Sequence, residues 1–334
     1  MHVSDKRKVQ NRSTKNDPVL MALPAACSDE RAAVEFMEKQ RWGEHPGCPR
    51  CGDMDVYKMK DSMTGERQAN YRWRCKGCKQ QFTVRIGTVF EDSRIELRHW
   101  CYAFWRAATS KKGVAALELH RQTGLSYKSC LFMLQRIRFA MNGSMPGPLA
   151  GPIEADETYV GGKPRNKLMG KAEREAHFAK KPAVLAILER GGRVRTGVVA
   201  DVTAKTLRDA LRENVNPAAS TLYTDEFFSY RKIGKEFAGG HHTTKHSVGE
   251  YARGDVHSNT VEGFFSIVKR GLNGIYHAVS KEHLHRYLCE FEFRYNHRYM
   301  DDGDRTRAAI LASEGKRLTY EESKASEEAY GTEA

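Results

Sequence analysis

The sequence predicts a multidomain chain with an N-terminal zinc ribbon, a small all-α helix-turn-helix domain and an α/β domain with a mixed sheet. Three observations predict it: two C-x-x-C pairs before residue 80, a helix-turn-helix pattern ending near residue 141, and alternating strand and helix patterns after residue 152. With 334 residues, of which 40% are hydrophobic, the chain is long enough for two or three domains with cores of their own.

The chain is strongly basic. It carries 55 Lys and Arg against 42 Asp and Glu, a net charge of +13, which favours a polyanionic partner such as DNA or RNA. A ribosomal or a secreted basic protein would share that sign of charge. No apolar run approaches the ~18 residues of a membrane span, and the apolar run at 19–23 is shorter than the core of a signal peptide. We therefore expect no membrane association and a bacterial cytoplasmic location at the nucleoid.

Changes in composition divide the chain. Residues 142–152 hold three prolines and three glycines and read as a linker. The expected segments are a flexible basic arm (1–24), a short helix (25–46), the zinc ribbon (47–90), the helix-turn-helix domain (91–141), the linker (142–152), the α/β domain (153–300) and an acidic C-terminal tail (301–334). Within the α/β domain we expect strands at 152–162, 182–188, 193–202, 220–225 and 241–248, a helix at 203–214, and long helices from 260 onward.

Four of the eight cysteines form two pairs, at Cys48 and Cys51 and at Cys75 and Cys78. Two such turns brought together supply the four thiolates that a structural zinc ion favours. Redox-active C-x-x-C motifs are the alternative, although a redox site uses one such pair beside a βαβ unit. The remaining cysteines are scattered singly, so the chain does not have a disulfide framework and its thiols are expected to be reduced.

Residues 113–141 have the pattern of two helices joined by a tight turn. Gly124 can adopt the left-handed conformation at the turn, and Ser126 is a ready N-cap for the second helix. The side chains expected to face DNA are Ser126, Tyr127, Lys128, Gln135, Arg136 and Arg138. A plain helical hairpin with solvated charges remains the alternative.

Three acidic residues are distinguished by their context in the α/β domain. Asp156 lies within a strand pattern, Asp225 ends another, and Glu262 lies early in the helix pattern at 259–271. One polar face of that helix carries Asn259, Glu262, Ser266 and Lys269. Three carboxylates at one end of a sheet would repel unless divalent cations held them, and paired Mg²⁺ ions held in this way serve phosphodiester chemistry. They could equally be three ordinary carboxylates among 42.

The ordered set of motifs resembles the ISXO2-like transposases of the IS1595 insertion-sequence family over roughly residues 30–300. The motifs are CPRCG at 48–52, CKGC at 75–78, IEADETYVGGK at 153–163, LYTDEF at 222–227 and the long segment HSNTVEGFFSIVKRG onward from residue 257. The resemblance implies an RNase H-like core of the DDE type with Asp156, Asp225 and Glu262 as ligands of two Mg²⁺ ions, for which Mn²⁺ can substitute. Lys269, seven positions after Glu262, matches the terminal lysine of the family.

The resemblance also implies a function and its partners. We expect a DNA transposase that binds the terminal inverted repeats of its element, cleaves the 3′ ends and joins them to target DNA, as a dimer or larger assembly. Two alternatives stay open: a non-catalytic DNA-binding regulator and an RNase H-like nuclease without strand transfer. Asn259 is an alternative third catalytic residue, Glu154 a substitute for Asp156, and His257 a candidate for contact with metal-bound water or DNA, or for a structural role.

Overall fold

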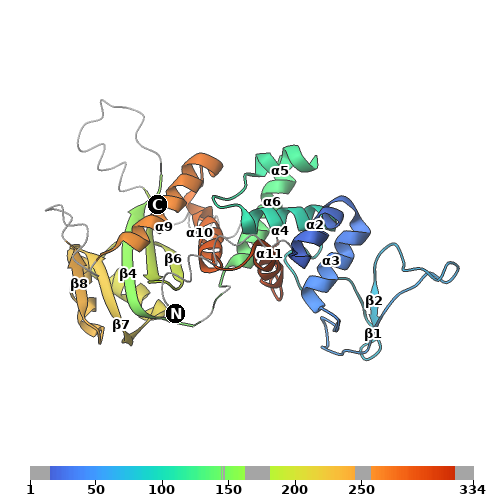
Figure 1. The fold of residues 1–334 in the computed structure, drawn as a ribbon, viewed down its shortest axis with the longest axis horizontal. Coiled ribbons are helices and arrows are strands. Elements are labelled where there is room, and N and C mark those ends of the chain that lie inside the picture. Colours follow the sequence, from blue (N-terminus) through green and yellow to red (C-terminus); the bar gives the residue numbers. More distant parts are fainter. Residues whose placement is uncertain (1–15, 144, 146, 162–180, 245–256, 320–334) are drawn as a thin grey trace. The chain divides into compact units, whose positions relative to one another are not determined.

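The computed structural model describes residues 16–143, 145, 147–161, 181–244 and 257–319 (Figure 1). These residues form two compact units. The N-terminal unit consists of residues 16–143 together with 299–319, and the sheet unit consists of the described residues between 145 and 298. The first 15 residues of the expected arm, the last 15 of the expected tail and the end of the expected fifth strand lie outside the described residues.

Six helices build most of the N-terminal unit: α2 (Pro18–Ser28), α3 (Glu30–Trp42), α4 (Leu97–Thr109), α5 (Ala116–Thr123), α6 (Tyr127–Met141) and α11 (Asp302–Leu311). Carboxylates cap the first two, because Asp17 accepts hydrogen bonds from the backbone of α2 and Asp29 from that of α3. Helix α3 ends at Gly43, which has a positive φ. The helix expected over residues 25–46 is therefore two helices with a break at Asp29.

A three-stranded antiparallel sheet follows α3 and carries the cysteine pairs. Its strands are β1 (Val56–Lys58), β2 (Trp73–Cys75) and β3 (Gln81–Phe82), in that spatial order. Trp42, Trp73 and Phe82 form a small aromatic core with ring centroids 5.8 to 6.4 Å apart. This core is too small to stabilise a domain of its own, as expected for a ribbon held by metal.

Two expected segments differ from the structure. Residues 18–24, expected in the flexible arm, belong to α2, where Pro18 starts the helix and Leu23 is buried. Residues 302–311, expected in an acidic tail, form α11, which packs against α2, α3, α4 and α6 (Figure 1). The acidic stretch that suggested a tail begins after α11, whereas Asp302 and Asp304 lie in the first turn of that helix, where they complement the helix dipole.

The sheet unit contains the expected mixed sheet. Its strands are β4 (Leu149–Tyr159), β5 (Ala183–Glu189), β6 (Val194–Val199), β7 (Val215–Asp225) and β8 (His241–Thr244), in the spatial order β6-β5-β4-β7-β8. Strands β4, β5 and β6 pair antiparallel, whereas β7 pairs parallel to both β4 and β8. Strand β4 begins at Leu149, so the linker expected to run to residue 152 is shorter than its prolines and glycines suggested.

Helices cover both faces of this sheet. One face of β5, with Val184, Ala186 and Leu188, packs against α9 (Asn259–Gly271) and α10 (Lys281–Asn296). The alternate residues Leu185 and Ile187 face α8 (Ala204–Asn214) and the short helices η1 (Phe228–Tyr230) and η2 (Ile233–Glu236). A π-helical turn, η4 (Leu272–Tyr276), continues α9.

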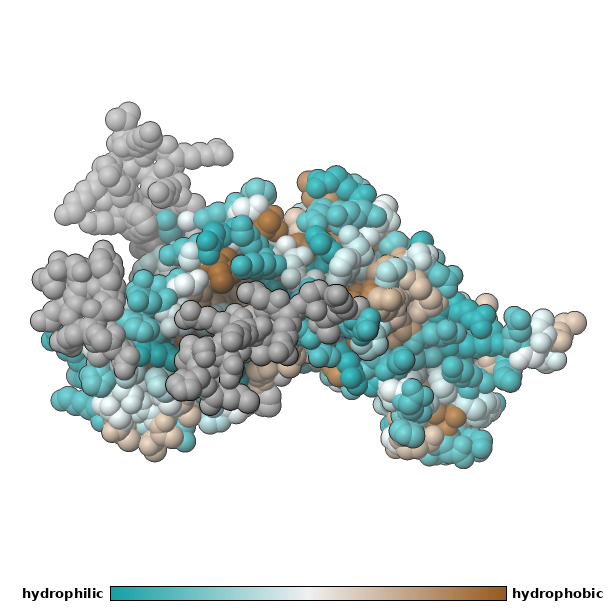
Figure 2. Space-filling view, in the orientation of Figure 1, coloured by the Kyte–Doolittle hydropathy of each residue, from teal (hydrophilic) through white to brown (hydrophobic). Residues whose placement is uncertain are grey.

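Over the described residues, the face in Figure 2 is largely hydrophilic, and its strongly hydrophobic residues lie in small separate spots. Among the described helices, none is both long enough and apolar enough to cross a membrane.

Candidate functional site

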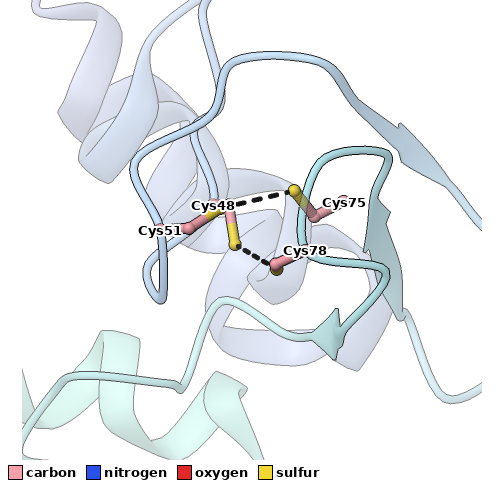
Figure 3. A group of neighbouring side chains, drawn as sticks. All are labelled: Cys48, Cys51, Cys75 and Cys78. Atoms are coloured by element: carbon pink, nitrogen blue, oxygen red, sulfur yellow. Dashed lines mark hydrogen bonds between the residues drawn. The ribbon is translucent and has the colours of Figure 1, made fainter.

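Four cysteines of the N-terminal unit point toward one another from two turns (Figure 3). The sulfur atoms of Cys48, Cys51, Cys75 and Cys78 all lie within 4.8 Å of one another. The Sγ atoms of Cys48 and Cys78 are 3.7 Å apart, and those of Cys51 and Cys75 are 3.6 Å apart. A tetrahedral zinc ion with Zn–S bonds of ~2.3 Å requires sulfurs about 3.8 Å apart. The cluster therefore fits a structural zinc site with four ligands.

The turns also favour the thiolate form of one ligand. Burial acts to raise the pKa of Cys48, but backbone N–H groups of Arg50 and Cys51 outweigh it and lower that pKa to about 7. Thiolates are the form that binds metal. The structure thus agrees with the zinc ribbon expected from the two cysteine pairs.

In the sheet unit, Asp156 and Asp225 occupy matching positions on two neighbouring parallel strands. Strand β4 pairs with β7 so that Glu154 lies opposite Tyr223. Asp156 and Asp225 each follow that pair by two residues, so both return to the same face and reach the same carboxyl-terminal edge. Ligand sites of open sheets gather at this edge.

Glu262 reaches the same region from α9. That helix packs on the face of the sheet that carries Ala186, the antiparallel partner of Asp156. The Ser258 hydroxyl donates to Glu262 Oε1 at 2.8 Å, and the backbone N–H of Glu262 donates to the Ser258 carbonyl. Ser258 therefore holds the Glu262 carboxylate against the first turn of α9.

Asp156 lies in a largely buried and acidic environment. Burial raises the pKa of Asp156, and the charges of Glu157, Asp225 and Glu262 raise it further, to about 7. The pKa of Glu157 is also raised, mainly by burial, although the Tyr230 hydroxyl donates to its carboxylate at 2.6 Å and acts in the opposite direction. A bound cation would relieve this repulsion.

The acidic residues border a pocket of about 690 Å³ between β4 and α9. Its lining residues are Asp156, Glu157, Thr158, Glu262, Phe265, Ser266, Lys269, Arg270, Asn273 and Gly274. Asp225 is not among them. The pocket thus combines carboxylates at one side with the cations of Lys269 and Arg270, a pairing that suits a phosphate-bearing ligand with metal ions.

The carboxylates are less closely gathered than the cysteines. In the described part of the chain, only the four cysteines form a group of three or more potential metal ligands whose atoms all lie within 4.8 Å of one another. Asp156, Asp225 and Glu262 are thus electrostatic neighbours that do not form a compact cluster. Like charges held close together without a cation would raise the energy of the site.

The three other residues considered from the sequence have distinct positions. Asn259 is exposed at the first position of α9, one turn before Glu262. Glu154 is fully buried and accepts hydrogen bonds from the backbone of α9 and from Arg190, so its oxygens are already engaged. His257 lies beside it, with Nδ1 3.4 Å from Glu154 Oε1.

The helix-turn-helix pattern has the expected local geometry. Gly124 ends α5 in the left-handed conformation, and Ser126 caps α6 by accepting a hydrogen bond from the Ser129 N–H at 3.1 Å. Tyr127 and Lys128 are exposed in the first turn of α6. These features leave the first turn available to a ligand.

The second half of α6 does not agree with the expectation. Gln135 is 5% exposed, Arg136 is 9% exposed and Arg138 is 1% exposed, so none of them presents a surface for base contacts. Arg136 instead donates to the Glu91 carbonyl and lies over the Phe132 ring. The sequence pattern indicated that only one face of α6 is buried, whereas α4, α5 and α11 all pack against this helix.

Comparison with known proteins gives the family. Residues 148–296 match the ISXO2-like transposase domain, and residues 28–81 match a transposase zinc-ribbon domain of the same group. A protein in transposable element ISH50 of Halobacterium salinarum is 30% identical over 277 residues, which cover 79% of this chain and 90% of the relative. The chain belongs to the ISXO2-like transposases of the IS1595 family.

A second relative and the domain limits agree with this membership. A transposase-like protein of Haemophilus influenzae is 36% identical over 105 residues, which cover 31% of this chain and 81% of the relative. No solved structure matches the chain. The matched transposase domain contains the pocket and its carboxylates, and the matched zinc-ribbon segment contains all four clustered cysteines. Membership indicates a nucleic-acid-processing enzyme that binds DNA.

Sequence reasoning missed several residues of this transposase pocket. Glu157 adds a carboxylate beside Asp156, and Arg270 and Asn273 extend the lining past Lys269. The two adjacent acidic residues at 156 and 157 were a sequence signal for Glu157. Asn273 lies in η4, and the sequence carries no clear signal for a π-helical turn.

Proposed function

We propose that the chain is a DDE-type DNA transposase that binds the terminal inverted repeats of an insertion sequence and carries out Mg²⁺-dependent 3′-end cleavage and strand transfer. The observation that carries this proposal is that Asp156, Glu262 and Lys269 line one pocket, while the register of β4 and β7 puts Asp225 on the same face and at the same edge of the sheet as Asp156. Asp156, Asp225 and Glu262 are 69 and 37 positions apart in sequence, and their positions on two parallel strands and on the helix that packs against the sheet support a common site. The mixed sheet covered by helices on both faces supports an RNase H-like core.

Each residue has a role in this proposal. Asp156, Asp225 and Glu262 hold two divalent cations, Mg²⁺ or Mn²⁺. When bound, these ions supply activation of the attacking water or 3′-hydroxyl and stabilise the leaving oxygen. Lys269 binds a DNA phosphate beside the carboxylates, on the pocket wall that it shares with Arg270. The side chains of the pocket therefore bind and orient the scissile phosphate.

DNA recognition falls to the N-terminal unit in this proposal. The zinc ribbon and the first turn of α6, with Ser126, Tyr127 and Lys128, contact the terminal repeats. Joining two element ends requires at least a dimer in the active complex, which acts at the bacterial nucleoid. The excess of 13 positive charges makes binding depend steeply on salt concentration.

The test uses duplexes that carry the inverted repeats flanking the gene. Wild-type protein with Mg²⁺ is expected to produce 3′-end nicks and joined products on a denaturing gel. Asp156→Asn, Asp225→Asn and Glu262→Gln are each expected to reduce cleavage by at least about 10³-fold, because electrostatic stabilisation of that size is lost with a metal ligand. All three variants are expected to bind the duplex within a few-fold of wild type.

Three outcomes would contradict the proposal. DNA binding without Mg²⁺-dependent cleavage by the wild type would identify a regulator. Hydrolysis that never yields joined products would identify a nuclease. Full activity of Glu262→Gln together with loss of activity in Asn259→Ala would transfer the third catalytic role to Asn259.

A further inference from the structure

A second set of side chains lies two residues before each carboxylate of the proposed site. Glu154 precedes Asp156 on β4, and Tyr223 precedes Asp225 on β7. Thr260 precedes Glu262 on α9. Together with Arg190, which follows β5, these residues are here called the anchoring layer: Glu154, Arg190, Tyr223 and Thr260.

Glu154 is the centre of the anchoring layer. Its side chain is 0% exposed, and both of its oxygens are engaged. Oε2 accepts from the backbone N–H groups of Thr260 and Val261, each at 2.9 Å. Oε1 accepts from the Thr260 hydroxyl at 2.9 Å and from Arg190 Nε at 2.6 Å. A buried carboxylate that accepts this many hydrogen bonds has little capacity left to bind a cation.

Helix α9 is capped by Glu154, a residue of strand β4, and not by a residue that directly precedes the helix. Ser258 occupies the N-cap position, but its side chain does not cap the helix and instead donates to Glu262. The free N–H groups of the first turn are satisfied by Glu154 from β4, and its negative charge complements the positive end of the helix dipole. Because each residue turns a helix by ~100°, a slip of α9 against β4 by one residue would rotate Glu262 away from Asp156.

Arg190 links this cap to the strand that carries Asp225. Its guanidinium lies 4.0 Å from the centroid of the Tyr223 ring, and it also donates to the carbonyl of His257. The Tyr223 ring in turn stacks on His242 of β8, with centroids 5.3 Å apart. One ion pair thus contacts β4, β7 and the segment that leads into α9, the three parts of the chain that supply the proposed metal ligands.

We infer that Glu154 and Arg190 are positioning residues that hold Asp156, Asp225 and Glu262 in register for divalent cations. This inference rests on the proposed function, because it assumes that those carboxylates bind metal. The pair does not touch the cation; it fixes the three supporting elements against one another. Side chains of this kind behind metal ligands change metal affinity by about 10–100-fold.

The test measures Mn²⁺ binding to the full-length, zinc-loaded protein from the loss of the free Mn²⁺ signal in electron paramagnetic resonance. Glu154→Gln and Arg190→Met are expected to weaken Mn²⁺ binding about tenfold or more. Thr260→Val keeps the backbone donor and removes only the hydroxyl, so it is expected to weaken binding about threefold, from the usual size of one hydrogen bond. It serves as the milder variant if Glu154→Gln does not fold.

The same unit offers a matched control. Glu292 on α10 also accepts from a backbone N–H, a threonine hydroxyl and an arginine, here Thr196 at 2.9 and 3.0 Å and Arg195 at 3.4 Å. This group joins α10 to the edge strand β6 and is not in the pocket lining. Glu292→Gln is expected to lower thermal stability as Glu154→Gln does, and to leave Mn²⁺ affinity within twofold of wild type.

The outcomes distinguish a failure of the proposed metal site from a failure of the anchoring layer. Asp156→Asn that binds Mn²⁺ as wild type does would overturn the metal site itself. Asp156→Asn without binding, together with wild-type affinity in a folded Glu154→Gln or in Thr260→Val, would overturn the anchoring layer alone. Equal weakening by Glu154→Gln and Glu292→Gln would also overturn it, because the effect would then follow from general destabilisation.

Discussion

The cysteine cluster and the acidic pocket are both candidate metal sites, and they are assembled in opposite ways. The four thiolates come from two turns within 31 residues, and their sulfurs already lie within the spacing of a zinc shell. The three carboxylates span 107 residues and are electrostatic neighbours without forming a compact cluster. The geometry of the cysteine cluster is set by its four ligands and their turns. The geometry of the acidic pocket is set by how the strands and the helix that carry its ligands pack together.

The difference follows from what each metal does. A structural zinc ion provides much of the folding free energy of a small ribbon, so its ligands can be its scaffold. A site for phosphodiester chemistry must stay open to a substrate, and its carboxylates repel one another until cations arrive. In the sheet unit, the anchoring layer accordingly fixes the two strands and the helix that carry the carboxylates. Loss of metal should therefore unfold the first site and leave the second folded.

The largest effect is expected from Cys48→Ser. Removing one of four thiolates should abolish stoichiometric zinc binding and unfold residues 47–90, because binding of a structural zinc ion supplies on the order of 10 kcal/mol of folding free energy. Zinc content and amide hydrogen exchange measure the two effects. Cys27→Ser is the control, since Cys27 lies in α2 outside the cluster. A folded, metal-free Cys48→Ser ribbon would show that zinc does not hold this region together.

Replacing Asp156 in the acidic pocket should have the opposite effect from Cys48→Ser and stabilise the protein at pH 8. In the folded, metal-free protein the pKa of Asp156 is about 7, against an ordinary value of 3.8. Between these values the unfolded chain loses the proton while the folded chain keeps it, so stability falls as pH rises from about 4 to 7. At pH 8, Asp156→Asn should be more stable than wild type, with about 4 kcal/mol as the upper limit.

Thermal unfolding at pH 4 and pH 8, in buffer freed of Mg²⁺ but with zinc retained, measures this difference. The two proteins should differ little at pH 4, where Asp156 is protonated in the folded protein and only about half ionised in the unfolded chain. Adding Mn²⁺ at pH 8 should stabilise wild type and leave Asp156→Asn unchanged. Lower stability of Asp156→Asn at pH 8 would mean that the carboxylate is not under electrostatic strain.

A smaller loss of stability is expected at the contact between the start of α2 and the start of α11. Asp17 caps α2 through the N–H groups of Val19 and Leu20, at 2.9 and 3.2 Å, and it also accepts from the Gly303 N–H at 3.0 Å. Asp17→Ala should cost about 2 kcal/mol, since it removes a cap and leaves a buried donor unpaired. Denaturant unfolding of the full chain measures the loss.

Asp29→Ala is the matched control, because Asp29 caps α3 through the Ala32 N–H at 2.8 Å and its removal should cost about 1 kcal/mol. Gly303→Ala should also destabilise the unit, as an added Cβ would lie 2.1 Å from the Asp17 oxygens. Equal losses for Asp17→Ala and Asp29→Ala would show that α11 adds nothing through this contact.

Local patterns predicted the local features well. The cysteine pairs, the glycine at the α5–α6 turn and the cap at Ser126 follow from short-range geometry and agree with the structure. The order of strands and helices in the sheet unit also followed from the sequence, because the helices carry one apolar face and the central strand β5 is a short run of apolar residues buried on both faces.

Features created by packing between distant segments could not be predicted. Helix α11 returns to the N-terminal unit although its residues were expected to belong to the C-terminal tail, and its approach helps to enclose α6. Glu154 looked like a substitute catalytic residue because it lies two positions from Asp156 on the same strand face. Its engagement by Arg190 and Thr260 depends on residues 36 and 106 positions away.

The smallest effect is expected at the proposed DNA-binding surface, and it distinguishes exposed from buried residues of α6. Lys128 lies in the exposed first turn, so Lys128→Ala should weaken DNA binding modestly and lower the salt dependence by about one released counterion. Arg138 is 1% exposed, so Arg138→Met should change thermal stability and leave the salt slope unaltered. Fluorescence anisotropy with labelled duplex at several salt concentrations measures both slopes. A reduced slope for Arg138→Met in a folded protein would show that α6 turns its second half toward DNA when it binds, and the surface would then extend along the whole helix.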